Sequence, residues 1–348
     1  MGDGNGNIRI VIIGFGNVGR SLAKILSFKK PVLEKKYGIY LSVVGVVDSK
    51  GMIIKENGLS SYELLKLCEL PRSGIRTYGE NAYDYVDLDL LYKITQPDIH
   101  VELTPSNYET GEPGLSNLLF ALNRGVNVVT ANKAPLVLGY EEIMNLAKAK
   151  GVYVKFRATV MGGTPLIDML LDIRSPEIEE IRGILNATTN FVLTTMHNEL
   201  IDFDEALQKA KILGIAEADP RLDVEGYDAA AKLVILSRIL GKPVSMDKIK
   251  RDSLSKVKLR DVINAMRNNH VIKYIAHIDL KNGYAEVKPF ELPRSETLSQ
   301  VNGTLNAVEI YSDIGKLFFM GKGGGGFETA HSVLDDILSI SIARRGST

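Results

Sequence analysis

The stretch from Ala216 to Lys232 gathers five carboxylates ahead of a single lysine, and this pattern could transfer protons. Asp228 precedes Lys232 by four residues. Small and apolar residues predict a helix beyond Gly226, through Leu240, and residues four apart lie on one face of a helix. We therefore expect the two side chains to meet on a face that is otherwise apolar.

Two opposed influences would act on the Lys232 ammonium. An apolar face disfavours the charged form, whereas carboxylates at Asp223 and Asp228 favour it, and this balance suits a group that gains and loses a proton. An Asp and a Lys four residues apart also commonly form a surface ion pair with no catalytic role. The stretch taken alone leaves both readings open.

A glycine-rich turn lies near the start of the chain. The apolar run Ile8 to Ile13 predicts a buried parallel strand, and the spacing from Arg20 to Phe28 predicts a helix. Between them lies Gly14-Phe15-Gly16-Asn17-Val18-Gly19. Such glycines permit a tight turn and close approach of a pyrophosphate, which the helix N-terminus attracts. We expect NAD or NADP to bind here.

The second strand, Leu41 to Val47, leaves the choice of cofactor open. It ends at Asp48, and a carboxylate at this point normally bonds the adenosine ribose hydroxyls, which favours NAD. Ser49 and Lys50 follow directly and Lys55 lies close by; these side chains could hold a 2′-phosphate, which favours NADP.

Two further strands, 98–103 and 126–129, each end in a polar run. These runs are Thr104-Pro105-Ser106-Asn107 and Thr130-Ala131-Asn132-Lys133. Ligands bind at the carboxyl edge of open α/β sheets. An ordinary turn explains the first run equally well, and Lys133 could be a solvated surface residue. Residues 104–107 could contact the nicotinamide side of the cofactor, and Lys133 could equally have a catalytic role. The candidate cofactor-binding residues at this edge are Thr104, Pro105, Asn132 and Lys133.

Composition excludes several classes of protein. The 348 residues are 45% hydrophobic and 24% charged, enough for two domains. A formal net charge of zero, without basic runs that interleave aromatics, argues against nucleic acid or a membrane surface as partner. The polar opening Met1 to Asn7 has no signal-peptide core and is expected to be disordered, and no apolar run is long enough to span a membrane.

Neither cysteine nor histidine predicts a metal site. The chain has one cysteine, which permits no intrachain disulfide and suits a reducing cytoplasm. Its five histidines lie far apart and show no metal-ligand spacing.

We expect an α/β fold of three segments. Residues 1–156 would form a Rossmann-type domain with a doubly wound parallel sheet, and residues 157–306 a second α+β domain for substrate binding, catalysis and dimerisation. Residues 307–348 would return to the nucleotide domain. Their glycine run, 321–326, would bring Gly325 to the cofactor, although a flexible loop explains the run as well.

Within the second domain, a strand is expected over Ile181 to Ala187. Thr188-Thr189-Asn190 would then cap a helix that begins at about Phe191. Val271 to Leu280 and Tyr284 to Phe290 flank Lys281-Asn282-Gly283 and predict a hairpin.

The chain resembles the homoserine dehydrogenase family over nearly its whole length. It is similar to the short form, which lacks an ACT domain and an aspartate kinase. The stretches that carry the resemblance are Gly14 to Gly19, Thr130 to Lys133, Gly183 to Asn190 and, above all, Ala216 to Lys232.

The resemblance implies reversible NAD(P)-dependent hydride transfer between L-homoserine and L-aspartate 4-semialdehyde. The reaction would belong to threonine, methionine and isoleucine biosynthesis, in a cytoplasmic homodimer. By match to the family motif, Lys232 would exchange the proton at the substrate oxygen and Lys133 would supply a second cation, while Asp223 and Asp228 orient Lys232. The substrate-binding residues would be Glu217, Asn186, Ala187 and Thr188.

Two positions depart from the family pattern. Many relatives place a glutamate of a monovalent-cation site where this chain has Arg157, and a guanidinium cannot ligate a cation, so we predict no metal. Ala187 replaces the usual glycine of its turn. If that position needs a positive φ, alanine costs stability there.

Two other functions remain as alternatives. One is an NAD(P)-dependent oxidoreductase of another small amino or hydroxy acid, and the other is a catalytically silent NAD(P)-binding sensor. The intact pair of Lys232 and Asp223 argues against the sensor. Cys68 lies in an amphipathic stretch typical of a buried thiol, which argues against a semialdehyde dehydrogenase that forms an acyl-enzyme through an activated cysteine.

Overall fold

The computed structural model describes residues 7 to 346, which fall into two compact units. The first comprises Met1–Thr159 and Gly325–Thr348, and the second is Val160–Gly324. The polar opening up to Gly6 lies outside the described residues. None of the described helices is long and apolar enough to span a membrane.

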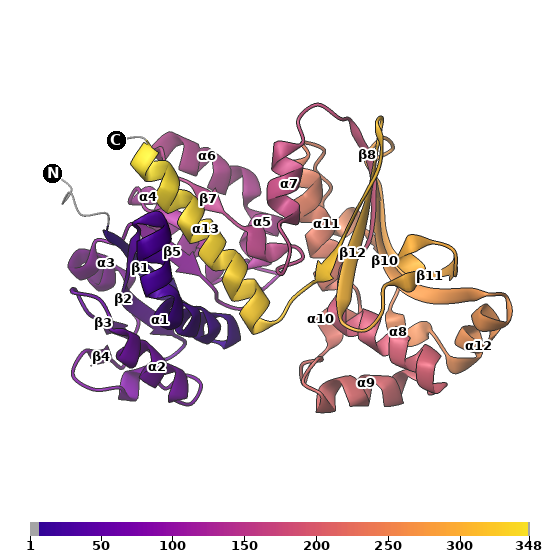
Figure 1. Ribbon diagram of the computed structural model, residues 1–348, viewed down its shortest axis with the longest axis horizontal. Helices are drawn as coiled ribbons and strands as arrows, with labels where there is room; N and C mark the ends of the chain where they lie inside the picture. The colour runs from indigo at the N-terminus through magenta and orange to yellow at the C-terminus, as the bar shows by residue number, and fades with distance from the viewer. Residues whose placement is uncertain (1–6, 347–348) are drawn as a thin grey trace. The chain divides into compact units, whose positions relative to one another are not determined.

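The first unit is built on a seven-stranded sheet in the order β4-β3-β2-β1-β5-β6-β7 (Figure 1). Strands β2, β1, β5, β6 and β7 run parallel, as expected for a doubly wound fold. The hairpin strand β3 and the short β4 extend one end antiparallel. The strands are β1 (Asn7–Ile13), β2 (Tyr40–Asp48), β3 (Gly51–Ile54), β4 (Ala82–Tyr83), β5 (Ile99–Glu102), β6 (Asn127–Thr130) and β7 (Val154–Lys155).

Helices bury both faces of this sheet. Ile10 and Ile12 of β1 belong to one core with residues of α1, α2 and α13. Val11 points to the opposite face, where Leu91 of α3 packs so closely that a Cβ at Gly45 would lie 2.5 Å from it. The helices are α1 (Asn17–Tyr37), α2 (Ser61–Glu69), α3 (Leu88–Thr95), α4 (Gly114–Asn123), α5 (Lys133–Leu138), α6 (Tyr140–Lys150) and α13 (Gly326–Gly346).

The length of α1 explains the wide spacing between the glycine turn and Asp48. The helix continues through Pro31 to Tyr37 and ends at Gly38, which adopts a left-handed conformation with φ 64°. Glycine takes this conformation without steric cost. Strand β2 begins two residues later, at Tyr40.

The second unit is a six-stranded sheet in the order β13-β12-β8-β10-β11-β9, in which β9 alone of the described strands pairs in parallel. The predicted hairpin is confirmed as β10 and β11. The strands are β8 (Ile178–Ile184), β9 (Lys250–Arg251), β10 (His270–Asp279), β11 (Tyr284–Pro293), β12 (Leu305–Ser312) and β13 (Gly315–Lys322). The helices are α7 (Leu166–Asp172), α8 (Ala187–Glu199), α9 (Phe203–Ile212), α10 (Arg221–Val224), α11 (Tyr227–Ile239) and α12 (Leu259–Arg267).

The segment expected to return to the nucleotide domain from residue 307 begins later than predicted. Strand β12 pairs antiparallel with β8, and β13 pairs with β12, so both belong to the second sheet. Only α13 joins the first unit, where it packs beside α1 (Figure 1). The residues of β12 do not show that its partner is β8, more than 120 residues earlier in the chain. The predicted boundary at residue 307 was therefore too early.

The expected helix start at Phe191 is also wrong. Strand β8 ends at Ile184, and α8 begins at Ala187 with Asn186 as its N-cap. The Asn186 Oδ1 accepts a hydrogen bond from the Thr189 backbone N–H at 2.9 Å. Asparagine is at least as good an N-cap as threonine, so the earlier cap prevails and Thr188 to Asn190 become helical.

Lys273 of β10 is a buried lysine that pairs with no carboxylate among the described residues. Its side chain is held by carbonyl oxygens: Nζ donates to Val301 O at 2.5 Å and to Asn302 Oδ1 at 2.9 Å. Burial, with a smaller contribution from the Arg294 charge, lowers the pKa of Lys273 to about 8. The fold therefore bears a cost for keeping this ammonium protonated at neutral pH.

This cost predicts a pH-dependent stability. Above about pH 8 the folded chain releases the Lys273 proton, whereas an unfolded lysine keeps it until about pH 10.5. The unfolded state then binds more protons, so the Lys273 contribution to the free energy of unfolding rises with pH in that window, by about 2 kcal/mol between pH 7.5 and 9.5. Lys273→Met should remove that rise in urea unfolding measured at both pH values. The exposed Lys281→Met should keep it, and equal slopes in the Lys273→Met variant and the parent chain would contradict the assignment.

Candidate active site

The glycine turn has the geometry of a phosphate cradle. A Cβ at Gly14 would lie 2.5 Å from the Leu103 carbonyl carbon, and one at Gly19 would clash with the Gly14 carbonyl oxygen, so both glycines permit close backbone packing. A Cβ at Gly16 would meet nothing within 4 Å. Gly16 precedes the first turn of α1, where backbone N–H groups favour an anion. Open space at this helix start fits a dinucleotide pyrophosphate.

At the end of β2, Asp48 is bound to its own loop. One carboxylate oxygen accepts from the Lys50 backbone N–H at 2.8 Å and the other from Ile75 N–H at 3.0 Å. Asp48 is buried, whereas Ser49 and Lys50 are exposed beside it. Lys55, the other lysine that could hold a 2′-phosphate, forms an ion pair with Glu63, with Nζ 2.5 Å from Oε1.

Sequence reasoning missed Arg72, which lies in the loop after α2. Its guanidinium donates to Asn17 Oδ1 of the glycine turn at 3.1 Å, and the neighbouring Ser73 hydroxyl lies 2.7 Å from Ser49 Oγ. The run Pro71-Arg72-Ser73-Gly74 carries an ordinary turn signal, and nothing local in it points back to a site 55 residues earlier.

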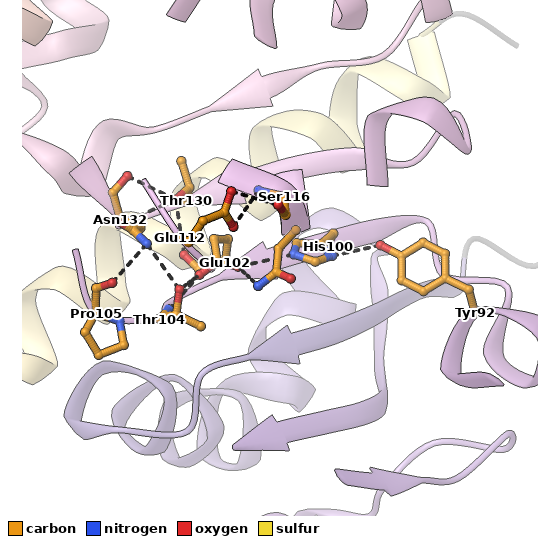
Figure 2. Close-up of polar contacts among 10 residues, drawn as sticks. Tyr92, His100, Glu102, Thr104, Pro105, Glu112, Ser116, Thr130 and Asn132 are labelled. Carbon is orange, nitrogen blue, oxygen red and sulfur yellow. Dashed lines mark hydrogen bonds and ion pairs between the residues drawn. The ribbon is translucent and has the colours of Figure 1, made fainter. Parts of the chain in front are cut away.

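Asn132 joins the two polar runs at the carboxyl edge of the first sheet (Figure 2). Its Oδ1 accepts from the Ala134 N–H at 3.1 Å and so caps α5, while its Nδ2 donates to Thr104 Oγ1 at 3.1 Å and, at 3.4 Å, to Pro105 O. Ser106 Oγ accepts from the Lys133 backbone N–H at 3.1 Å. Lys133 is the first residue of the short helix α5, which begins at this edge.

Gly325 lies directly before α13, with φ 118°, a value that favours glycine. The following residue, Gly326, approaches the glycine turn: a Cβ there would lie 3.2 Å from Asn17 O. The cofactor candidates of the first unit thus come together from the amino end, β5, β6 and the start of α13.

The second unit brings together four of its predicted residues. Asn186 Nδ2 donates to Asp223 Oδ1 at 2.6 Å and to Asp228 Oδ2 at 2.9 Å. Lys232 Nζ donates to the same Asp228 oxygen at 2.7 Å and to Leu185 O at 2.5 Å. The predicted helix is confirmed as α11, and Lys232 on it is only 6% exposed. The pair is therefore not a solvated surface ion pair.

The arrangement prepares both charged groups for chemistry. An ammonium has three N–H donors, and Lys232 uses two within the described residues, which leaves one for a substrate oxygen. Burial, and then repulsion from Asp228, raise the pKa of Asp223, although hydrogen bonds from Thr188 and Asn186 oppose this. Asp223 thus holds a proton at a pH where an exposed aspartate has lost it.

The remaining substrate candidates occupy different settings. Thr188 is buried in the first turn of α8, where its hydroxyl oxygen also lies 3.3 Å from Ile215 O. Ala187 is the first helical residue and is not among the residues with positive φ, so alanine is unstrained there. Glu217 is exposed in the loop before α10 and joins none of the hydrogen bonds described for this cluster.

Arg157 serves a structural ion pair in the first unit. Its backbone N–H donates to Asp336 Oδ2 at 2.9 Å, and its guanidinium contacts Asp335 Oδ2 at 2.9 Å, which ties the end of the nucleotide-binding segment to α13. Between residues 7 and 346 no cluster of three His, Cys, Asp or Glu side chains could hold a metal. Burial raises the pKa of Cys68, which disfavours the thiolate that a nucleophile needs.

Two family models together match most of the chain. A family model described as "Homoserine dehydrogenase, NAD binding domain" matches residues 14–157, and one described as "Homoserine dehydrogenase" matches residues 165–338. The homoserine dehydrogenase of Methanocaldococcus jannaschii is 40% identical over 336 residues, 95% of this chain and 98% of the relative.

Two further matches extend over nearly equal lengths. An NAD(+)-dependent homoserine dehydrogenase of Pseudomonas canavaninivorans is 34% identical, covering 95% of this chain and 96% of the relative. A solved structure of a hyperthermophilic archaeal homoserine dehydrogenase mutant in complex with NADPH has a TM-score of 0.82 and 32% identity, covering 97% and 98%. The chain belongs to the homoserine dehydrogenase family.

Proposed function

We propose that the buried cluster of Asn186, Asp223, Asp228 and Lys232 performs the proton transfer of homoserine dehydrogenase. The chain would interconvert L-homoserine and L-aspartate 4-semialdehyde, with NAD or NADP supplying the hydride acceptor or donor when bound. The observation that carries this proposal is the buried Lys232 ammonium, which keeps one N–H for a substrate oxygen.

Each direction of the reaction needs a proton at that oxygen. During semialdehyde reduction, Lys232 Nζ donates a hydrogen bond to the carbonyl oxygen and then its proton, as negative charge develops there. During homoserine oxidation, the neutral amine accepts the hydroxyl proton. Asp228, bound to Nζ at 2.7 Å, stabilises the ammonium and orients it. Asn186 fixes both carboxylates. By match to the family motif, Lys133 would be the second cation of the reaction.

The substrate's remaining groups would be held by the same unit. Thr188 and Ala187 at the start of α8 would line the pocket, and Glu217 would bind the substrate ammonium group. Glu217 would have to act from an exposed loop. The residues proposed to hold the cofactor are Gly14, Phe15, Gly16, Asn17, Val18, Gly19, Asp48, Ser49, Lys50, Thr104, Pro105, Asn132, Lys133 and Gly325.

We also propose a cytoplasmic homodimer. A single cysteine suits a reducing compartment. In the second unit, β13 is an edge strand of the described sheet, and it exposes Leu317 and Met320, with Ile314 in the turn before it. Exposed apolar side chains on an edge strand favour contact with another chain.

The test of the catalytic role is Lys232→Met, which keeps the unbranched side chain up to its fourth atom and removes the ammonium with its transferable proton. We expect kcat for homoserine oxidation to fall by about 100-fold or more, a range typical of a lost general acid or base. The matched control is Lys256→Met, because Asp252 and Lys256 form the same i,i+4 pair at 2.6 Å on the surface. Near-normal kcat in folded Lys232→Met would refute the role.

Cofactor choice gives a second expected outcome. Both oxygens of Asp48 already accept backbone N–H groups, while Lys50 is exposed beside Asp48 and the Arg72 guanidinium contacts Asn17 of the glycine turn, so we expect NADP to be preferred. Lys50→Ala combined with Arg72→Ala should lower kcat/KM for NADP at least tenfold and change it little for NAD. Lys55→Ala is the control, because Lys55 is paired with Glu63. An unchanged ratio of the two cofactors would contradict this preference.

The proposed homodimer gives a third expected outcome. Sedimentation velocity at micromolar concentration should show a dimer, and Leu317→Lys with Met320→Lys should shift it towards monomer, because a buried unpaired charge opposes association. A parent chain that sediments as a monomer would exclude the dimer.

A further inference from the structure

The carboxylate of Glu102 is completely buried at the end of β5, and no step proposed above uses it. A carboxylate in a parallel strand is unusual, since such strands are buried on both faces and mostly apolar. It is surrounded by groups that can donate (Figure 2). Carboxylate oxygens accept hydrogen bonds, so these donors satisfy the buried Glu102 side chain.

On one side, Glu102 binds the turn that follows its own strand. Oε1 accepts from the Thr104 backbone N–H at 2.7 Å and also from the Thr104 hydroxyl. The same hydroxyl oxygen accepts from Asn132 Nδ2 at 3.1 Å. The carboxylate therefore fixes the Thr104 hydroxyl in the orientation that leaves its lone pairs to Asn132.

The chain of hydrogen bonds continues to Lys133. Asn132 Oδ1 accepts from the Ser106 hydroxyl at 2.8 Å, and Ser106 Oγ in turn accepts from the Lys133 backbone N–H at 3.1 Å. Four hydrogen bonds in series thus connect Glu102 with the first residue of α5. Both polar runs at the carboxyl edge depend on this connection.

The second carboxylate oxygen of Glu102, Oε2, contacts residues that lie away from the carboxyl edge of the sheet. Oε2 accepts from Asn117 Nδ2 of α4 at 2.9 Å and lies 3.7 Å from His100 Nε2. Tyr92 Oη lies 2.8 Å from His100 Nδ1. Burial raises the pKa of Tyr92, so its hydroxyl keeps its proton beside the imidazole.

We propose that Glu102 is a positioning residue, which holds Thr104, Asn132 and Lys133 in the conformation that receives the nicotinamide end of the cofactor. It touches neither cofactor nor substrate, because its side chain has no exposed surface. Its effect passes through the Thr104 hydroxyl. The inference rests on the proposed function only in naming the ligand that this edge receives.

The experiment compares four variants. Glu102→Leu removes the acceptor, Glu102→Gln keeps one carbonyl oxygen towards Thr104, Thr104→Val removes the connecting hydroxyl at equal size, and Asn117→Leu is the control on the opposite side of the carboxylate. We would measure the dissociation constant of NADPH by fluorescence titration, kcat for homoserine oxidation, and Tm. The titration needs no turnover, so a parent chain that binds NADPH without oxidising homoserine would refute the proposed reaction and still permit this test.

We expect Thr104→Val and Glu102→Leu to weaken NADPH binding and lower kcat at least tenfold each, while Glu102→Gln stays within about threefold of the parent. Asn117→Leu should lower Tm and leave affinity and kcat unchanged. The Glu102→Leu, Thr104→Val double variant should lose no more than the worse single variant, because both act on one connection.

Three results would overturn the proposal. The first is parental NADPH affinity and kcat in Thr104→Val, which remains decisive if Glu102→Leu fails to fold. The second is an equal kinetic loss in Asn117→Leu, which would make Glu102 a merely structural residue. The third is strictly additive losses in the double variant, which would mean that Thr104 acts independently of Glu102.

Discussion

The charge of Lys232 has to be compensated inside the second unit, and the surrounding elements meet that requirement together. On α11 its neighbours Ala231 and Leu233 are completely buried and offer no polar partner. Compensation comes from Asp228 one turn earlier and from the Leu185 carbonyl at the end of β8. A buried charge without such partners would cost several kcal/mol. The strand end, the start of α8 and the register of α11 are therefore mutually constrained.

In each unit, an asparagine that follows a strand is the N-cap of the next helix and also binds a polar group of the site. In each case Oδ1 caps the helix: Asn132 accepts from Ala134 N–H, and Asn186 accepts from Thr189 N–H. In each case Nδ2 donates away from the helix, to the Thr104 hydroxyl or to the two aspartates. Aspartate could supply the cap but not the donor, because a carboxylate only accepts hydrogen bonds, whereas the amide carries both an acceptor oxygen and an NH2 group.

Local patterns predicted those features whose cause is local. The glycine turn, the strands that end at Asp48 and Thr130, and the helix carrying Lys232 each follow from the period of apolar residues and from glycine. The N-cap of α8 was misplaced because three adjacent polar residues, Thr188 to Asn190, competed with Asn186 for the same role. The structure decides between them through the end of β8, which is fixed by pairing with β10 and β12.

The features that escaped prediction depend on distant contacts. Arg72 reaches the glycine turn across 55 residues of sequence, and the sheet that receives β12 is defined by partners more than 120 residues away. Glu102 gave a usable signal, an acid inside an apolar strand, but its partners come from α4 and from the turn after β5. The sequence of the strand shows that a buried carboxylate needs hydrogen-bond donors, but it does not show which residues supply them.

The late position of α13 in the chain has a consequence for synthesis. Six of its side chains, from Ala330 to Ile340, belong to the same core as β1 and α1. A ribosome releases this helix only after all of residues 160–324 have been made, so the nucleotide-binding unit waits, with the apolar face of α1 uncovered, while the other unit emerges. Domains usually fold as units from the amino end. Here the first unit to begin is the last to be completed, and a chain cut short in the second unit keeps an uncovered apolar surface that chaperones and proteases can recognise.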